Sequence, residues 1–160
     1  MPDLNLKAMS ISNLFRTHSK IMDELRRRGI IRSYNNPVSD YTEWLVSSRM
    51  NLDLSRKSQA GYDAIGSNGL RYQIKGRRNT ALNKSTQLGV IRNLSEKKFD
   101  FLIGVIFNSD YSVAYAALIP QNMIAELSHY SEHQNGNILH LRKKILEVDG
   151  VEDITERLIV

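Results

Sequence analysis

The stretch that decides the fold is Gly61-Tyr62-Asp63-Ala64-Ile65-Gly66-Ser67-Asn68-Gly69-Leu70-Arg71-Tyr72-Gln73-Ile74-Lys75-Gly76-Arg77-Arg78. Asn68-Gly69 in its middle is a strong turn signal, and apolar and polar residues alternate after it. Tyr72 and Ile74 point to one face of a strand, whereas Gln73 and Lys75 point to the other. The stretch therefore predicts a β-hairpin over residues 60–78, with one face for the core and one that can line a site.

The length of the hairpin loop decides on which face of the hairpin Asp63 lies. A two-residue Asn68-Gly69 turn would set Asp63 opposite Ile74, on the core face. A three-residue loop, Ser67-Asn68-Gly69, would set Asp63 opposite Gln73, with Gly69 in the left-handed conformation that ends such loops. We predict the three-residue loop, which brings Asp63, Gln73 and Lys75 onto one face because residues directly opposite each other share a face.

These side chains have a definite chemical use. The carboxylate of Asp63 and the amide carbonyl of Gln73 are hard oxygen ligands that suit Mg²⁺. Lys75 is a compact cation that can hold an attacking water and stabilise charge on a phosphate. Arg77 and Arg78 follow at once and can bind flanking phosphates. The combination is typical of metal-dependent hydrolysis of a phosphodiester.

A second carboxylate is expected from the helix before the hairpin. Asn36 and Pro37 are suited to the start of a helix. Glu43 shares a stripe of that helix with Val46 and Met50, which is an unusual place for a carboxylate. Because Gln73 brings no charge to a metal, Glu43 is the expected additional ligand.

The remaining pattern predicts a single α/β domain over residues 1–160. The expected elements are helices over 11–28, 85–98, 120 to about 130 and from about 151, and strands over 101–107, 112–119 and 137–141. Together with the hairpin, this order predicts a central mixed β-sheet flanked by α-helices. We expect the N-terminal helix to pack on its own domain rather than on a second protomer.

Composition narrows the class of protein. The chain has no cysteine, which excludes a disulfide framework, and its apolar runs are too short for a membrane helix. No secretory signal is recognised, so a cytoplasmic protein with no membrane partner is expected. The net charge is +5, and residues 71–98 alone hold 8 Lys and Arg against 1 Asp or Glu. Such a block favours a polyanion such as nucleic acid, although an ordinary solvated basic face is the alternative.

The sequence gives little indication of a zinc site, a phosphate-binding loop or a serine nucleophile. His129 and His133 are four residues apart, but no third zinc ligand is evident. The chain has neither a glycine-rich phosphate loop nor a GxSxG nucleophile elbow.

The arrangement Asp63…Gln73-Ile74-Lys75 resembles the core motif of the PD-(D/E)xK nuclease superfamily, in the D…QxK form found in Mrr-like restriction endonucleases. The resemblance covers about residues 36–119. One departure is Tyr62, which stands where the superfamily motif has proline. The resemblance implies a restriction-endonuclease-like fold and a Mg²⁺-dependent endodeoxyribonuclease in which Mn²⁺ can substitute.

The resemblance also implies roles for individual residues. Asp63, Gln73, Lys75 and Glu43 would be catalytic, and Asp63, Gln73 and Glu43 would hold the metal. Arg77, Arg78 and Lys84 would bind the DNA backbone. DNA is favoured over RNA by the resemblance alone. The small size suggests that two copies form a homodimer, or that the chain belongs to a larger restriction or defence complex.

Two rival hypotheses stay open at the level of sequence. The first is an inactive nucleic-acid-binding module on the same fold. The second is a protein-interaction subunit without nucleic-acid affinity. For single residues, Asp63 could be an ordinary turn residue, Gln73 and Lys75 could line a solvated strand, and Glu43 could simply reach water.

Overall fold

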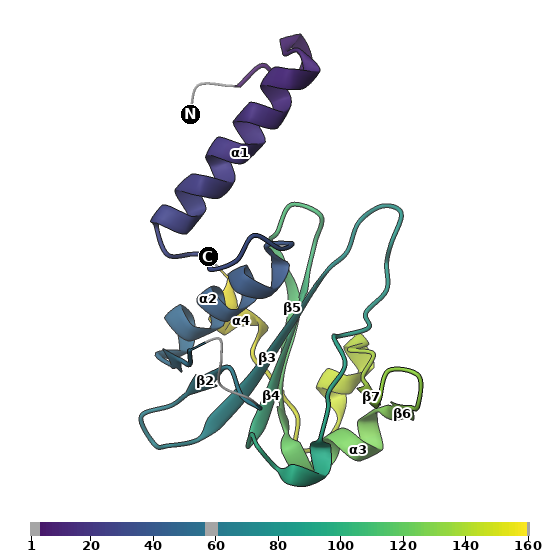
Figure 1. Ribbon diagram of the computed structural model, residues 1–160. Coiled ribbons are helices and arrows are strands. Elements are labelled where there is room, and N and C mark those ends of the chain that lie inside the picture. Colours follow the sequence, from purple (N-terminus) through teal and green to yellow (C-terminus); the bar gives the residue numbers. More distant parts are fainter. Residues whose placement is uncertain (1–3, 57–60, 160) are drawn as a thin grey trace.

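The chain forms a mixed α/β structure around a six-stranded sheet (Figure 1). The computed structural model describes residues 4–56 and 61–159. In spatial order the strands are β1 (Asp53–Leu54), β2 (Ala64–Ile65), β3 (Arg71–Arg78), β4 (Phe101–Phe107), β5 (Val113–Pro120) and β8 (Glu152–Asp153). β3 and β4 are parallel, and the other neighbouring strands are antiparallel. The predicted mixed sheet is confirmed.

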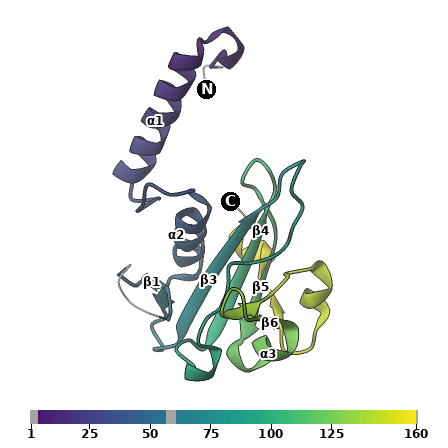
Figure 2. The same cartoon turned by 45° about the vertical axis from the view of Figure 1, so that its right-hand side comes forward.

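Both faces of the sheet are covered (Figure 2). On one face, α2 (Val38–Met50) and α4 (Thr155–Leu158) pack on a core cluster. The other face is covered by the β3–β4 connection and the region of α3 (Ile124–Leu127), with a second cluster beneath it. The smaller elements are the 3₁₀ helices η1 (Leu6–Ala8), η2 (Leu94–Glu96), η3 (Gln121–Met123) and η4 (Lys143–Glu147), and the hairpin β6 (His129–Ser131) and β7 (Gly136–Ile138). In the part of the chain that the structure describes, no helix is long and apolar enough to cross a membrane.

β4 is the central strand that its sequence predicts. Leu102 and Ile106 belong to one core cluster, whereas Ile103 and Val105 belong to the other. All four are fully buried. Burial of each such side chain stabilises the fold by roughly 1.5–3 kcal/mol, so this strand anchors both layers.

The hairpin has the predicted three-residue loop. Its ladder sets Ala64 opposite Tyr72, and the loop is closed by hydrogen bonds from the Gly66 N–H to the Leu70 carbonyl and from the Gly69 N–H to the Gly66 carbonyl. Gly69 has φ +80°, the left-handed conformation that glycine adopts without strain. The β-hairpin is therefore confirmed, except that its expected first residue, 60, lies outside the described residues.

The expected helix over residues 85–98 is wrong. The segment is largely extended, and only Leu94–Glu96 forms a 3₁₀ turn. Leu88 and Ile91 are buried as expected, but their backbone N–H groups donate to the carbonyls of Leu139 and Asn137. Asn93 and Lys97 have positive φ, which no α-helix accommodates. Pairing with a distant segment thus replaces the helix that the spacing of apolar residues predicts.

The C-terminal elements are shorter than expected. The helix predicted from Pro120 to about residue 130 consists of η3 and α3 and ends at Leu127, because the chain turns into β6. The strand expected over 137–141 is the shorter β7. The final helix begins at Thr155, whose N–H and hydroxyl donate to the Asp153 carboxylate.

The N-terminal helix α1 (Ile11–Arg27) forms where predicted but does not pack as predicted. The Ser10 hydroxyl accepts from the Asn13 N–H and caps its start. Gly29, with φ +72°, follows its end. None of its residues is buried, and Figures 1 and 2 show it projecting away from the sheet. Its last turns adjoin the start of α2, whereas the linker after Gly29 directs the rest of the helix outward.

Candidate active site

Asp63 lies where β2 separates from β3. Its N–H donates to the Tyr72 carbonyl over 2.8 Å, and its carboxylate accepts from the Ile74 N–H over 2.7 Å. The side chain thus continues the pairing of β3 where the short strand β2 has ended. Burial raises the pKa of Asp63 above its ordinary value, while the Ile74 N–H and the Lys75 ammonium act in the opposite direction.

Gln73 and Lys75 share the face of β3 that is turned toward the β3–β4 connection. In the parallel ladder they lie beside Leu102 and Gly104, whose face carries the cluster of Leu88 and Leu141. The Gln73 Oε1 is shielded from solvent and has no hydrogen-bond donor among the described residues. A buried carbonyl oxygen without a donor costs free energy, and a bound water or cation would satisfy it.

The amine of Lys75 lies beside the β3–β4 connection. A Cβ added to Gly89 would lie 3.6 Å from the Lys75 Nζ, so this glycine borders the amine. Burial lowers the pKa of Lys75, the charges of Asp63 and Glu43 raise it, and the charge of Arg92 lowers it. The effect is mutual for Asp63, whose pKa the Lys75 charge lowers.

Glu43 faces Asp63 from α2. Burial raises the pKa of Glu43, and the negative charge of Asp63 raises it further. Both carboxylates line one cavity of about 220 Å³. Its lining residues are Arg32, Asp40, Glu43, Ser55, Arg56, Tyr62 and Asp63. The structure therefore places Glu43 and Asp63 in the lining of one cavity.

The sequence pattern does not reveal Arg32, which forms an ion pair with Glu43. Its guanidinium also donates to the Ser55 carbonyl over 3.0 Å. The buried Asp40 carboxylate accepts from the N–H groups of Arg32 and Ser33 and so fixes the loop that carries the arginine. No local pattern pairs residues 32 and 43, because only the path of this loop brings them together.

The residue types of the expected ligand set suit a hard divalent cation, but Gln73 and Lys75 are not among the residues that line the cavity of Glu43 and Asp63. Two carboxylates and one amide carbonyl are oxygen ligands of the kind that Mg²⁺ and Mn²⁺ prefer. The buried Gln73 Oε1 without a donor agrees with this fit. Over residues 4–56 and 61–159, however, no three His, Cys, Asp or Glu side chains lie close enough together to hold a metal by themselves. A metal at this site would depend on the amide of Gln73 and on water.

The three basic residues predicted to bind DNA lie further along the chain. Arg77 and Arg78 line a groove of about 350 Å³ beside the start of α2. Arg78 is about 13 Å along β3 from Ile74, at 3.3 Å per residue. The guanidinium of Arg78 donates to the Ser109 carbonyl over 2.6 Å and lies over the Tyr111 ring, so it fastens the β4–β5 turn. Lys84 is exposed on the β3–β4 connection.

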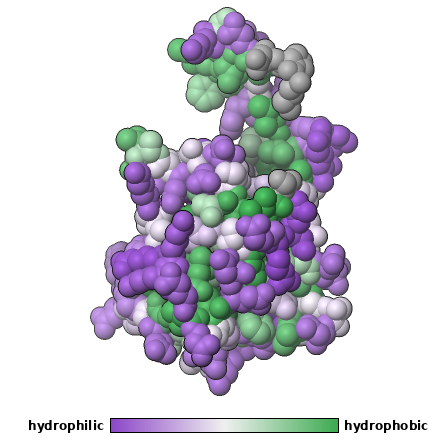
Figure 3. All heavy atoms as spheres, turned by 180° about the vertical axis from the view of Figure 1, so that it is seen from behind, coloured by the Kyte–Doolittle hydropathy of each residue, from purple (hydrophilic) through white to green (hydrophobic). Residues whose placement is uncertain are grey.

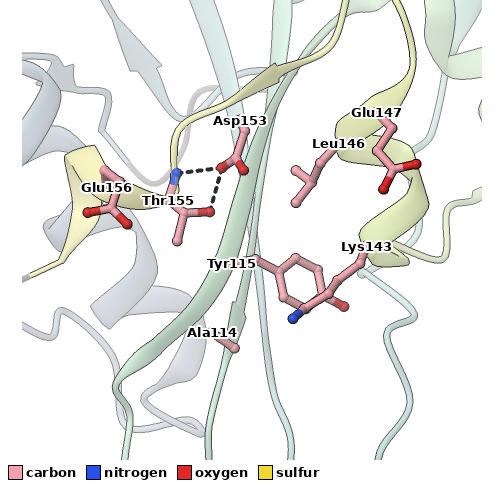
Figure 4. Close-up of a pocket in the computed structure, with 8 residues that line it drawn as sticks. All are labelled: Ala114, Tyr115, Lys143, Leu146, Glu147, Asp153, Thr155 and Glu156. Atoms are coloured by element: carbon pink, nitrogen blue, oxygen red, sulfur yellow. Dashed lines mark hydrogen bonds between the residues drawn. The ribbon is translucent and has the colours of Figure 1, made fainter.

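A separate groove on the far side of β5 contains none of the predicted residues (Figure 4). It has a volume of about 570 Å³, and three carboxylates border it: Glu147, Asp153 and Glu156. Asp153 accepts from the N–H and hydroxyl of Thr155 at the start of α4, as the dashed lines show. This groove is therefore not the candidate active site.

Comparison with known proteins adds no assignment: no protein-family model matches the chain, and no curated protein matches its sequence.

Proposed function

We propose that the protein is a Mg²⁺-dependent endonuclease that hydrolyses DNA phosphodiester bonds on a restriction-endonuclease-like fold. The observation that carries the proposal is the buried, donor-free Oε1 of Gln73. Gln73 lies on β3, and the N–H of the following residue, Ile74, donates to the Asp63 carboxylate. Asp63 in turn lines the same cavity as Glu43. A restriction or defence role in the cytoplasm is part of the same proposal.

Each of the four site residues has its own role in this proposal. Glu43, Asp63 and Gln73 would hold the metal, which when bound supplies Lewis acidity toward the phosphate. Lys75 would position the attacking water and stabilise the charge that develops on the phosphate. Partial enclosure strengthens this electrostatic effect, because fewer water molecules screen the amine.

The basic surface supports a nucleic-acid substrate. Arg77 and Lys84 have no ion pair within the described residues, so both remain available to phosphates. Arg32 and Arg56 line the cavity of the carboxylates, and the charge of Arg92 acts on Lys75. Neutralised phosphates release counterions, which gives such an interface its affinity.

The test is cleavage of supercoiled DNA with Mg²⁺ or Mn²⁺, in comparison with a chelator. We expect nicking or linearisation by the wild type, and at least a hundredfold loss in Lys75→Ala and in Asp63→Ala. Lys143→Ala, which removes an equivalent charge on η4, is the matched control and should cleave normally. Unchanged activity in both site variants would overturn the assignment.

A DNA-binding module without turnover is the second candidate. It is favoured by the ion pair of Glu43 with Arg32, which neutralises one of the two carboxylates without any metal. The module should shift DNA on a gel equally well with metal and with a chelator. The nuclease requires metal for cleavage, so the two experiments together separate the candidates.

A further inference from the structure

The first half of the apolar face of α1 has no cover within the described part of the chain, whereas Met22 and Leu25 in its second half are half-buried. The members of the whole face, called the α1 stripe, are Ile11, Leu14, Phe15, His18, Ile21, Met22 and Leu25. At 3.6 residues per turn they occupy an arc of roughly 120°, and the charged residues of the helix lie outside this arc. Ile11 and Phe15 are 75% and 72% exposed, although such side chains ordinarily pack against a core.

The second half of the α1 stripe forms one wall of an apolar groove, called the α1 groove. Ile21, Met22 and Leu25 face Tyr41 and Trp44 of α2 across a volume of about 630 Å³. Figure 3 shows apolar atoms along the projecting helix and at the neck where it joins the domain. The α1 groove is thus continuous with the exposed first half of the α1 stripe.

The exposed first half of the α1 stripe is complementary to the α1 groove of a second copy. A two-fold axis perpendicular to α1 places the first half of one helix against the second half of the other. We propose that a second copy of this chain covers the α1 stripe, with the two helices antiparallel. Ile11, Leu14 and Phe15 of each copy then lie at the mouth of the other copy's α1 groove.

The exposed apolar area is sufficient for such a pair. Six large residues on and before α1 are exposed: Leu4, Leu6, Ile11, Leu14, Phe15 and Ile21. At roughly 100 Å² each they present on the order of 600 Å² per chain, near the ~800 Å² that each partner contributes to a standard interface. The walls of the α1 groove add to this area. Exposed apolar area of this extent often marks an interaction site on a protein surface.

The proposal does not rest on the proposed nuclease activity, and its test needs neither metal nor DNA. The full chain is measured by sedimentation velocity and light scattering at tens of micromolar. Phe15→Glu introduces a charge into the α1 stripe. Asn13→Glu introduces the same charge on the opposite side of the helix and is the matched control. Because no residue of α1 is buried, neither variant should unfold the domain, and circular dichroism checks this point.

We expect the wild type and Asn13→Glu to have twice the mass of the chain. Phe15→Glu should weaken the dimer at least tenfold and sediment as a monomer. A monomeric wild type would overturn the proposal, and flotation of that monomer with anionic vesicles would assign the α1 stripe to a membrane surface instead. A dimer that persists in Phe15→Glu would also overturn it, because another surface would then hold the two copies together.

Discussion

The guanidinium of Arg32 is paired with the carboxylate of Glu43, across the mouth of the cavity that Asp63 also lines. The pair joins the loop before α2 to the helix itself. Both side chains are largely shielded, at 29% and 16% exposure, so solvent screens the pair less than an exposed ion pair. A cation of the protein therefore compensates a carboxylate that the proposed metal would also need.

Arg32→Ala should tighten metal binding. Removal of the guanidinium frees the Glu43 carboxylate and lowers the positive potential at the cavity, so Mn²⁺ affinity should rise severalfold in calorimetry. The variant should also lose about 1 kcal/mol of stability, because Glu43 is left shielded without a partner. Arg28→Ala, on the exposed end of α1, is the control. Weaker Mn²⁺ binding would instead make Arg32 a support of the ligand geometry.

The carboxylates should make the metal-free protein less stable as the pH rises. The pKa values of Glu43 and Asp63 are raised in the folded chain. Their contribution to stability is therefore complete below the unfolded-state pKa and is lost as the pH rises through the raised folded-state pKa. The pKa of Lys75 is lowered, so its contribution is unfavourable at neutral pH and is relieved as the pH rises toward the ordinary lysine value.

Asp63→Asn should consequently stabilise the metal-free protein at neutral pH. An amide oxygen can still accept the Ile74 N–H, while the buried charge is removed. We expect the free energy of unfolding to rise by on the order of 1 kcal/mol in urea titrations at pH 7. The difference should shrink toward pH 4, because the raised pKa of Asp63 favours its protonated form as the pH falls. A variant that is less stable than the wild type at both pH values would contradict the expected stabilisation.

Metal should stabilise the wild type and not the Asp63→Asn variant. A ligand at a hundred times its dissociation constant adds about 2.7 kcal/mol, which for a chain of this size is a rise in Tm of roughly 5–10 °C. Asp63→Asn should lose most of that rise in thermal melts with Mn²⁺. Asp149→Asn removes an exposed carboxylate far from the cavity and should keep it. Equal shifts in both variants would place the metal elsewhere.

Gly76→Ala should disturb the contact between α2 and β3. A Cβ at residue 76 would lie 1.9 Å from the Thr42 Oγ1, and Thr42 is fully buried. We expect a loss of about 2 kcal/mol or more, because a packed core accommodates an added methyl only by moving the helix. The double variant with Thr42→Ala should recover part of the loss in chemical denaturation. If the double variant recovers none of the lost stability, the backbone of β3 requires glycine and the contact with Thr42 does not.

Arg77 and Arg78 should differ in their effect on DNA binding. Arg77→Ala should weaken DNA binding. It should also reduce the slope of the logarithm of the binding constant against the logarithm of the salt concentration by about one, because one phosphate contact is removed. Arg78→Ala should change the slope less, since its guanidinium already donates to Ser109. It should instead lower stability by about 1 kcal/mol. Salt titrations of fluorescent duplex DNA separate the two, and equal slopes for both variants would contradict the distinction.

Sequence alone predicted the parts of the structure that are decided locally. Asn68-Gly69 set the hairpin loop because few other residues accept the φ of +80° at residue 69. The apolar run from Phe101 predicted the bounds of the central strand. The register predicted that Asp63, Gln73 and Lys75 share a face, whereas Glu43 was singled out by its place among apolar residues and by the family resemblance; of these residues, Asp63 and Glu43 line one cavity.

The parts that depend on distant partners were not predictable in this way. Leu88, Ile91 and Leu94 have the spacing of a helix, yet the backbone around them bonds to residues 137–141. Arg32 reaches Glu43 only because Asp40 holds the intervening loop. The outward direction of α1 depends on a linker whose path the apolar pattern does not encode.

The extended connection between β3 and β4 has a consequence for synthesis of the protein. Its backbone is held by Leu139, Asn137 and Leu141, which leave the ribosome some fifty residues after Thr86 and Leu88. Contacts so far apart in the chain form late, since their loop must close first. Lys75 lies beside this same segment. The segment beside Lys75 therefore gains its backbone partners only after residues 137–141 have left the ribosome.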